Sequence, residues 1–112
     1  MEIRQLAIYP VKGEPGRMLE RAEVEGEGFA GDRRKRQPVH LVGADETPET
    51  TRANVFVDAA PEAVVALVGS RVRLGSATLL VTQLPSGCAG VYAQVIDPGE
   101  VRVGDTIEVR DT

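Results

Sequence analysis

One cysteine, one histidine and no tryptophan occur in this chain of 112 residues, and aromatic side chains make up only 4% of it. A single cysteine excludes an internal disulfide framework and is typical of a reducing compartment. No apolar run approaches the ~20 residues that a membrane-spanning helix needs. The first residues, Met-Glu-Ile-Arg-Gln, lack the apolar stretch of a secretory signal. We therefore expect a cytoplasmic protein with no membrane partner.

Acidic residues outnumber basic ones, which gives a formal net charge of −4 and an isoelectric point near 5.0. Nucleic-acid-binding domains usually carry a basic footprint, and single strands also need aromatic platforms, so we expect no nucleic-acid partner. The run Arg33-Arg34-Lys35-Arg36 is a local exception. It either binds an anion or a nucleic acid, or forms a solvated basic loop that Asp32 and the acidic segment 20–27 balance.

Short β-branched runs broken by glycine dominate the apolar pattern, and the length fits a single domain over residues 1–112. The pattern predicts strands at residues 3–9, 18–24, 39–42, 54–57, 71–74, 77–82, 91–96 and 101–109, the last interrupted at Gly104.

Three turns support these strands. Leu74-Gly75-Ser76-Ala77 has the glycine-first, two-residue loop of a type II′ hairpin. Asp97-Pro98-Gly99-Glu100 places proline and glycine as a type II turn requires, with the glycine at a positive φ. Gly104-Asp105 marks a further turn or a bulge.

One helix is predicted to begin at Pro61 and to end at Gly69, with apolar residues spaced i, i+3 and i+4 from Val64. Ala60, at its N-cap, offers no side-chain acceptor. About eight short strands and one short helix favour a mostly β fold, a small closed or nearly closed β-barrel that hides its strand edges.

Cys88 lies in a loop of small residues between two predicted strands, in the sequence Leu84-Pro85-Ser86-Gly87-Cys88-Ala89-Gly90. The glycines leave backbone room beside the sulfur, so a ligand can come close. A lone cysteine is a candidate nucleophile or ligand when partners exist elsewhere in the chain. The alternative is a small buried hydrophobic residue.

His40 falls on the strand face opposite Val39 and Leu41 if residues 39–42 alternate. It is either a base or ligand, or a structural histidine. One cysteine and one histidine match no zinc spacing, which excludes a zinc site.

Arg52 and Asn54 stand between a polar loop and the strand predicted at 54–57. Together they could hold a phosphate at the entrance of this strand, or form a surface ion pair and a turn cap. Lys12 follows the first strand. It is either a second cation that binds an anion or a solvated lysine in a turn.

The order of these segments resembles the MOSC domain, the module at the C-terminus of molybdenum cofactor sulfurases that also occurs as stand-alone bacterial proteins. The resemblance rests on IYPVKG (8–13), GFAGDRRKR (28–36), PVHLVG (38–43), TRANV (51–55), LVGSRVRLGSATLLVT (67–82), the Cys88 loop and GVYAQVIDPGEVRVGDTI (90–107).

The resemblance implies a strand-rich barrel whose cysteine, here Cys88, carries a persulfide sulfur to the molybdenum cofactor or ligates molybdenum. It also implies that Arg52 and Asn54 bind the phosphate of this cofactor, with Lys12 in support and Arg33 near the same mouth. Larger members carry a helical insertion after the cysteine, whereas here only one residue separates Cys88 from Gly90.

Three functions follow from this resemblance. In the first, Cys88 receives sulfur from a cysteine desulfurase or another donor and delivers it to a molybdenum cofactor or a molybdoenzyme. In the second, the domain is a non-catalytic module that binds an anion or a partner. The third is a molybdenum-dependent reductase of N-oxygenated compounds, which the missing insertion makes the least favoured.

Overall fold

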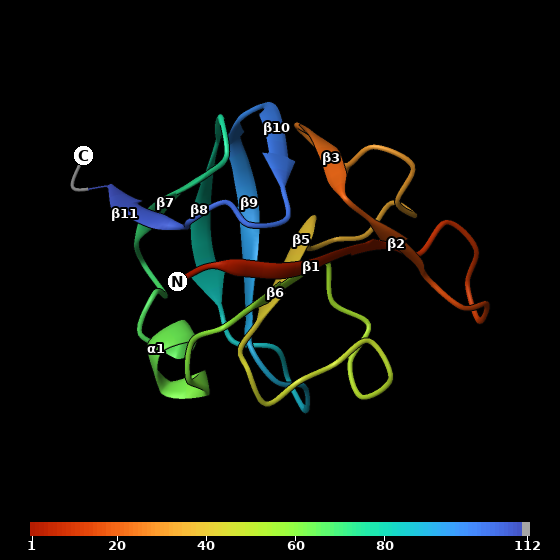
Figure 1. The fold of residues 1–112 in the computed structure, drawn as a ribbon, viewed down its shortest axis with the longest axis horizontal. Helices are drawn as coiled ribbons and strands as arrows, with labels where there is room; N and C mark the ends of the chain where they lie inside the picture. Colours follow the sequence, from red (N-terminus) through yellow and green to blue (C-terminus); the bar gives the residue numbers. More distant parts are fainter. Residues whose placement is uncertain (111–112) are drawn as a thin grey trace.

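Two β-sheets and one short helix form the regular structure of residues 1–110, the residues that this computed structural model describes (Figure 1). The larger sheet has the spatial order β11 (Glu108–Arg110), β7 (Arg71–Leu74), β8 (Ala77–Gln83), β9 (Val91–Asp97), β5 (Val39–Val42), β6 (Val55–Val57), β1 (Ile3–Ile8) and β2 (Arg17–Leu19). The smaller sheet has the order β10 (Gly99–Arg102), β3 (Arg21–Glu25) and β4 (Gly28–Phe29). This confirms the predicted mostly β fold with one short helix.

The larger sheet stays open within residues 1–110, with β2 and β11 as its edge strands. Several connections join it to the smaller sheet, two of them at β10. Strand β9 runs through Pro98 into β10, and Ser76 of the β7–β8 hairpin donates its N–H to the Glu100 carbonyl at 2.9 Å. The two sheets therefore enclose one core without a closed ring of hydrogen bonds. The predicted closed or nearly closed barrel is not confirmed.

Alternation along the strands builds this core. Val39 and Leu41 of β5 and Ala22 and Val24 of β3 are buried in one apolar cluster. Each valine or leucine side chain among them stabilises the fold by about 1.5–3 kcal/mol when it is fully buried. A second, smaller cluster lies apart from this core and consists of Ala7, Tyr9, Val42, Ala53 and Phe56. This outer cluster supports the candidate site.

Two predicted strands are each divided between the sheets. Residues 18–24 contribute to β2 and then to β3, because the chain bends at Glu20, whose carbonyl accepts the N–H of Val103 at 2.9 Å. Residues 101–109 contribute to β10 and β11, which a turn at Gly104 separates. Strand β4 was not predicted, because two residues are too few to show a period of alternation.

Helix α1 spans Pro61–Val65, which is shorter than the predicted helix ending at Gly69. Ala60 supplies no side-chain cap, as predicted. Beyond Val65 the chain continues in turns and then hydrogen-bonds to the sheet. The N–H of Gly69 donates to the carbonyl of Val81 in β8 at 2.8 Å. Within residues 1–110, no helix has the length and apolar character that crossing a bilayer requires.

The two glycine turns had different outcomes. The β7–β8 hairpin is confirmed, because Leu74 pairs with Ala77 and Gly75 has a φ of +62°. The type II turn at 97–100 is wrong, because Gly99 has no positive φ and begins β10. Glycine is needed there for space instead: a Cβ on Gly99 would lie 2.5 Å from the backbone nitrogen of Ala77.

The parallel pairing of β5 with β6 decides where the candidate site forms. Parallel neighbours cannot be joined by a tight turn, so residues 43–54 cross back from the end of β5 to the start of β6. Figure 1 shows this connection and residues 84–90 at the same end of the larger sheet. The crossover and the cysteine loop therefore lie on either side of one region of the surface, at this end of the larger sheet.

Candidate functional site

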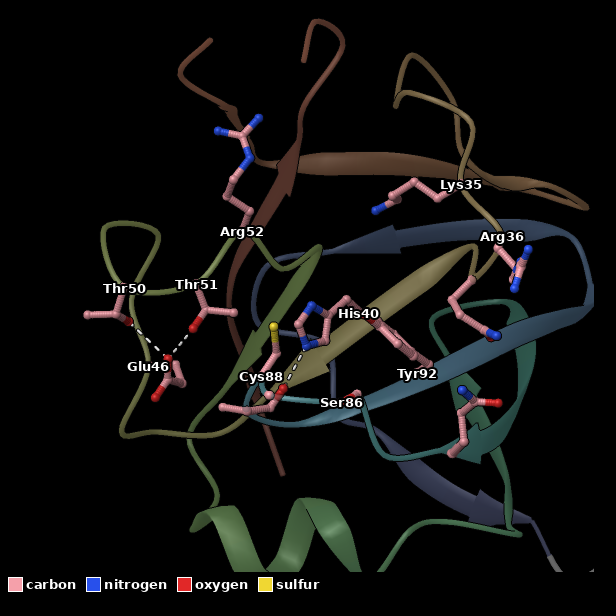
Figure 2. Close-up of a pocket in the computed structure, with 14 residues that line it drawn as sticks. Lys35, Arg36, His40, Glu46, Thr50, Thr51, Arg52, Ser86, Cys88 and Tyr92 are labelled. Carbon is pink, nitrogen blue, oxygen red and sulfur yellow. Dashed lines mark hydrogen bonds between the residues drawn. The ribbon is translucent and has the colours of Figure 1, made fainter. Parts of the chain in front are cut away.

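A cleft of about 930 Å³ opens beside β5 and β9 (Figure 2). Its walls come from the basic run, the crossover 43–54 and the cysteine loop. The lining residues are Lys35, Arg36, Gln37, His40, Glu46, Thr50, Thr51, Arg52, Gln83, Ser86, Gly87, Cys88, Ala89 and Tyr92. This volume is in the range of sites that bind small molecules. Cys88 and Arg52 share this concave surface, as the phosphate-and-sulfur hypothesis requires.

The floor of the cleft is a row of residues on neighbouring strands. His40 of β5 pairs with Tyr92 of β9, and their rings meet edge to face with centroids 5.1 Å apart. On the other side, Asn54 donates its N–H to the His40 carbonyl at 2.9 Å. Val39 and Leu41 point into the core, so His40 lies on the opposite face, as the alternation predicts.

His40 is only 6% exposed, and its Nε2 lies 2.7 Å from the carbonyl oxygen of Ala89. A carbonyl only accepts, so Nε2 carries the hydrogen and Nδ1 is the acceptor of the neutral ring. Burial lowers the pKa of His40; the Ala89 carbonyl raises it, the Lys35 charge lowers it, and Glu46 raises it. Nδ1 has no hydrogen-bond partner among residues 1–110, and Figure 2 shows it turned into the cleft.

The Cys88 loop rests directly on β5. Ala89 packs against the outer cluster, and Gly90 follows with a φ of +80°. A Cβ on Gly90 would lie 2.2 Å from the carbonyl oxygen of Leu41, so only glycine allows this approach. The thiol of Cys88 is exposed, and Figure 2 shows its sulfur directed into the cleft. The alternative of a buried hydrophobic cysteine is therefore wrong.

Asn54 is fully buried and lies beneath the cleft, outside its lining. Its Oδ1 accepts from the His40 N–H at 3.0 Å and from Lys35 Nζ at 3.3 Å. Its Nδ2 donates to the Ala7 carbonyl at 3.1 Å and to Asp32 Oδ2 at 2.9 Å. These four bonds use the full capacity of the amide. The predicted bond from Asn54 to a phosphate therefore has no free atom to make it.

Arg52 stands at the edge of the cleft against Tyr9. Its guanidinium carbon lies 4.4 Å from the centre of the Tyr9 ring, and Nη1 donates to the Glu14 carbonyl at 2.9 Å. The Tyr9 hydroxyl donates to the Ala53 carbonyl at 2.9 Å. Burial raises the pKa of Tyr9; the Arg52 charge lowers it and the Asp32 charge raises it. Tyr9 thus remains a protonated platform for the arginine.

A smaller hollow of about 130 Å³ adjoins the cleft at Lys35 and Arg52, which line both spaces. Lys12 and Arg33 line this hollow but not the cleft that contains Cys88. The structure therefore brings three of the predicted cations, Lys12, Arg33 and Arg52, to one place. It separates two of them from the sulfur.

Sequence reasoning missed two cations of the cleft. It named Arg33 as the nearest member of the basic run, whereas Lys35 and Arg36 line the cleft and Arg34 pairs with Glu27 on the surface. The signal that could have identified them was the basic run of residues 33–36. Because residues 30–38 form no regular element, no period indicates which side chains turn inward.

Sequence reasoning also missed Glu46, the one carboxylate among the lining residues of the cleft within residues 1–110. Its Oε1 accepts the hydroxyl of Thr50 at 3.1 Å and also the hydroxyl of Thr51. These bonds shape the crossover, which lies in the irregular part of the chain.

The fold and the site define a β-rich domain with an exposed thiol in a cation-lined cleft. Similar solved structures are YuaD from Bacillus subtilis, with a TM-score of 0.81, 19% identity and coverage of 96% of this chain and 94% of that one. YiiM from Escherichia coli has a TM-score of 0.69 and 17% identity over 100% of this chain and 71% of that one. YiiM from Geobacillus stearothermophilus has a TM-score of 0.74 and 11% identity over 98% of this chain and 75% of that one.

No protein-family model matches the sequence, and no curated protein matches it significantly. At these identities the structural likeness shows the fold alone. It supports the MOSC-like fold that the sequence resemblance implies.

Proposed function

We propose that this domain carries sulfane sulfur on Cys88 and delivers it to a molybdenum centre. One observation carries the proposal: the exposed Cys88 thiol opens into the same cleft as Lys35, Arg36 and Arg52. A thiol in such an electropositive, accessible place is suited to exchange with persulfides. Cations beside it favour an anionic donor or acceptor.

Loading of Cys88 needs only the exchange of one S–S bond for another, whereas delivery of the sulfur as sulfide would also need two electrons from a thiol reductant. The Cys88 thiolate attacks the outer sulfur of a donor persulfide, the donor's S–S bond breaks, and its electron pair leaves on the donor thiolate. Cys88 then holds the sulfur as a persulfide. A cysteine desulfurase is the proposed protein donor.

The molybdenum cofactor fits this site as an acceptor that brings most of its own ligands. Residues 1–110 contain no group of three or more His, Cys, Asp or Glu side chains that could hold a metal. Cys88 would supply one soft sulfur ligand. Lys12, Arg33 and Arg52, around the smaller hollow, would neutralise the phosphate of the cofactor. When bound, the cofactor would supply the metal centre that receives the sulfur.

A non-catalytic binding module is the second candidate function. The observation that favours it is the short connection after Cys88, where Ala89 and Gly90 lead straight into β9. In this function the cleft docks an anionic ligand or partner, and the thiol takes no part.

Mass spectrometry of the intact protein tests sulfur carriage. The chain is incubated with a cysteine desulfurase and cysteine, and Cys88→Ser is the matched control. We expect a gain of about 32 Da, one sulfur atom, on the native chain and none on Cys88→Ser. A native chain that gains no sulfur would leave the binding module as the better account.

A further inference from the structure

Positive charge flanks the centre of the cleft on two sides. Figure 2 shows Arg52 on one side and Arg36 on the other, with His40 between them. Arg36 forms no ion pair within residues 1–110, and Arg52 donates to a backbone carbonyl rather than to a carboxylate. The Oε1 of Glu46 is occupied by threonine hydroxyls. In a chain of net charge −4, these two guanidinium groups favour a ligand with separated anionic groups.

His40 offers a second contact for a ligand. The residue is only 6% exposed, and its Nδ1 is open to the cleft and has no partner among residues 1–110. Because Nε2 is fixed as the donor to Ala89, Nδ1 accepts, and a ligand in the cleft can donate an S–H, N–H or O–H group to it.

We propose, on the basis of the sulfur-carrier function above, that the cleft binds a small anionic hydropersulfide as a sulfur donor. This donor, R–S–SH, is of tripeptide size and carries carboxylates on both sides of its sulfur. The carboxylates pair with Arg36 and Arg52, and the outer S–H donates to His40 Nδ1. The outer sulfur is thereby presented to Cys88, and the cleft of about 930 Å³ has room for such a molecule.

The transfer is balanced without any further reactant. The Cys88 thiolate attacks the outer sulfur, and the S–S bond of the donor breaks. The electron pair goes to R–S⁻, which takes up the proton that the Cys88 thiol released to solvent. The products are Cys88–S–SH and R–SH, so no oxidant or reductant is consumed.

Glutathione persulfide and its diethyl ester form a matched pair of probes, because the ester keeps the size and the sulfur but lacks both free carboxylates. The readout is the initial rate at which Cys88 gains a sulfur, measured by quenched mass spectrometry. We expect the rate to saturate with rising concentration of the free acid and to be about tenfold above the rate with the ester. The rate with the free acid should fall when salt is added. Equal rates for the two probes would overturn the proposal.

Arginine variants test the carboxylate contacts. The double change Arg36→Gln with Arg52→Gln is expected to bring the two rates together, whereas Arg71→Gln, an exposed arginine on β7, keeps the tenfold preference. If Arg71→Gln removes the preference equally, the overall charge of the protein and not the cleft accounts for it.

Two His40 variants test the S–H contact. In His40→Asn the amide ends near the position of Nδ1, whereas in His40→Gln it reaches toward Nε2 and the Ala89 carbonyl. We expect His40→Asn to retain a rate within about threefold of native and His40→Gln to lose about tenfold with both probes. The reverse order would show that His40 acts only by holding the loop. If His40→Asn does not fold, the arginine variants still test whether the cleft binds the anionic donor.

The desulfurase experiment separates this proposal from the function it rests on. If Cys88 is loaded by the desulfurase but shows no preference for glutathione persulfide over its ester, the sulfur-carrier function stands and the small donor is wrong. If neither donor loads Cys88, both fail.

Discussion

The Nε2 of His40 donates to the carbonyl oxygen of Ala89 at 2.7 Å and so ties β5 to the cysteine loop 49 residues further along the chain. The bond fixes the tautomer of the ring and holds the residue next to Cys88. Gly90, the next residue of the loop, lies against β5 at the Leu41 carbonyl. The position of the thiol therefore depends on two contacts with one central strand.

The buried ring of His40 makes stability depend on pH. Burial, the first cause, holds its pKa below the ordinary value of 6.5 in the folded protein; of the facing charges, Lys35 lowers it and Glu46 raises it. The unfolded chain then binds a proton at higher pH than the folded one. The stabilisation is complete above about pH 6.5 and is lost as the pH falls toward the folded pKa.

Two measurements check this dependence. Urea unfolding should give a free energy that decreases from about pH 7.5 to about pH 5.5, and the decrease should be smaller in His40→Gln. The NMR titration is direct, because the chain has one histidine. A titration midpoint at or above 6.5 would contradict the prediction.

Replacement of Asn54 by alanine should destabilise the fold rather than only weaken ligand binding. The change leaves the His40 N–H and the Ala7 carbonyl buried without partners and releases Lys35. We expect a loss of about 3 kcal/mol in the free energy of unfolding in urea. Gln83→Ala, an exposed amide in the wall of the cleft, is the control and should change stability by less than about 0.5 kcal/mol. Equal effects would show that Asn54 holds nothing in place.

Alternation and glycine turns predicted most strands, because both are local signals. The period of two along β5 placed His40 opposite Val39 and Leu41, and the Gly75 hairpin followed from four residues. The division of residues 18–24 between two sheets was not predictable in this way. It depends on the contact of Glu20 with Val103, which lies far along the chain.

The sequence predicted which segments contribute to the site, but not which of their side chains face the cleft. Cys88 and Arg52 were named from loop composition and from the family resemblance, and the cleft holds both. Whether a polar side chain faces a ligand or a buried partner depends on packing, which is why Asn54 was placed among the ligands. Lys35 and Arg36 were missed because an irregular segment gives no period.

Native Cys88 should react readily with an alkylating reagent. Its thiol is exposed in an open loop, so the rate with iodoacetamide should lie within about tenfold of the rate for the urea-unfolded chain. The measurement is the mass of the quenched protein against time. A native rate lower by about a thousandfold would mean that the thiol is closed off, and the binding module would then be the better account of the cleft.

Gly87 and Gly90 provide a matched pair for the contact between the cysteine loop and β5. Their φ values are +79° and +80°, so alanine carries the same backbone strain at either position, about 1–2 kcal/mol. A Cβ on Gly87 meets nothing within 4 Å, whereas one on Gly90 would lie 2.2 Å from the Leu41 carbonyl oxygen. We therefore expect Gly87→Ala to cost only the strain, and Gly90→Ala to cost at least about 2 kcal/mol more in urea unfolding. Because Gly90→Ala also lifts the loop from β5, it should slow loading of Cys88 with sulfur, whereas Gly87→Ala should not. Equal costs for the two variants would show that the loop does not depend on its close approach to Leu41.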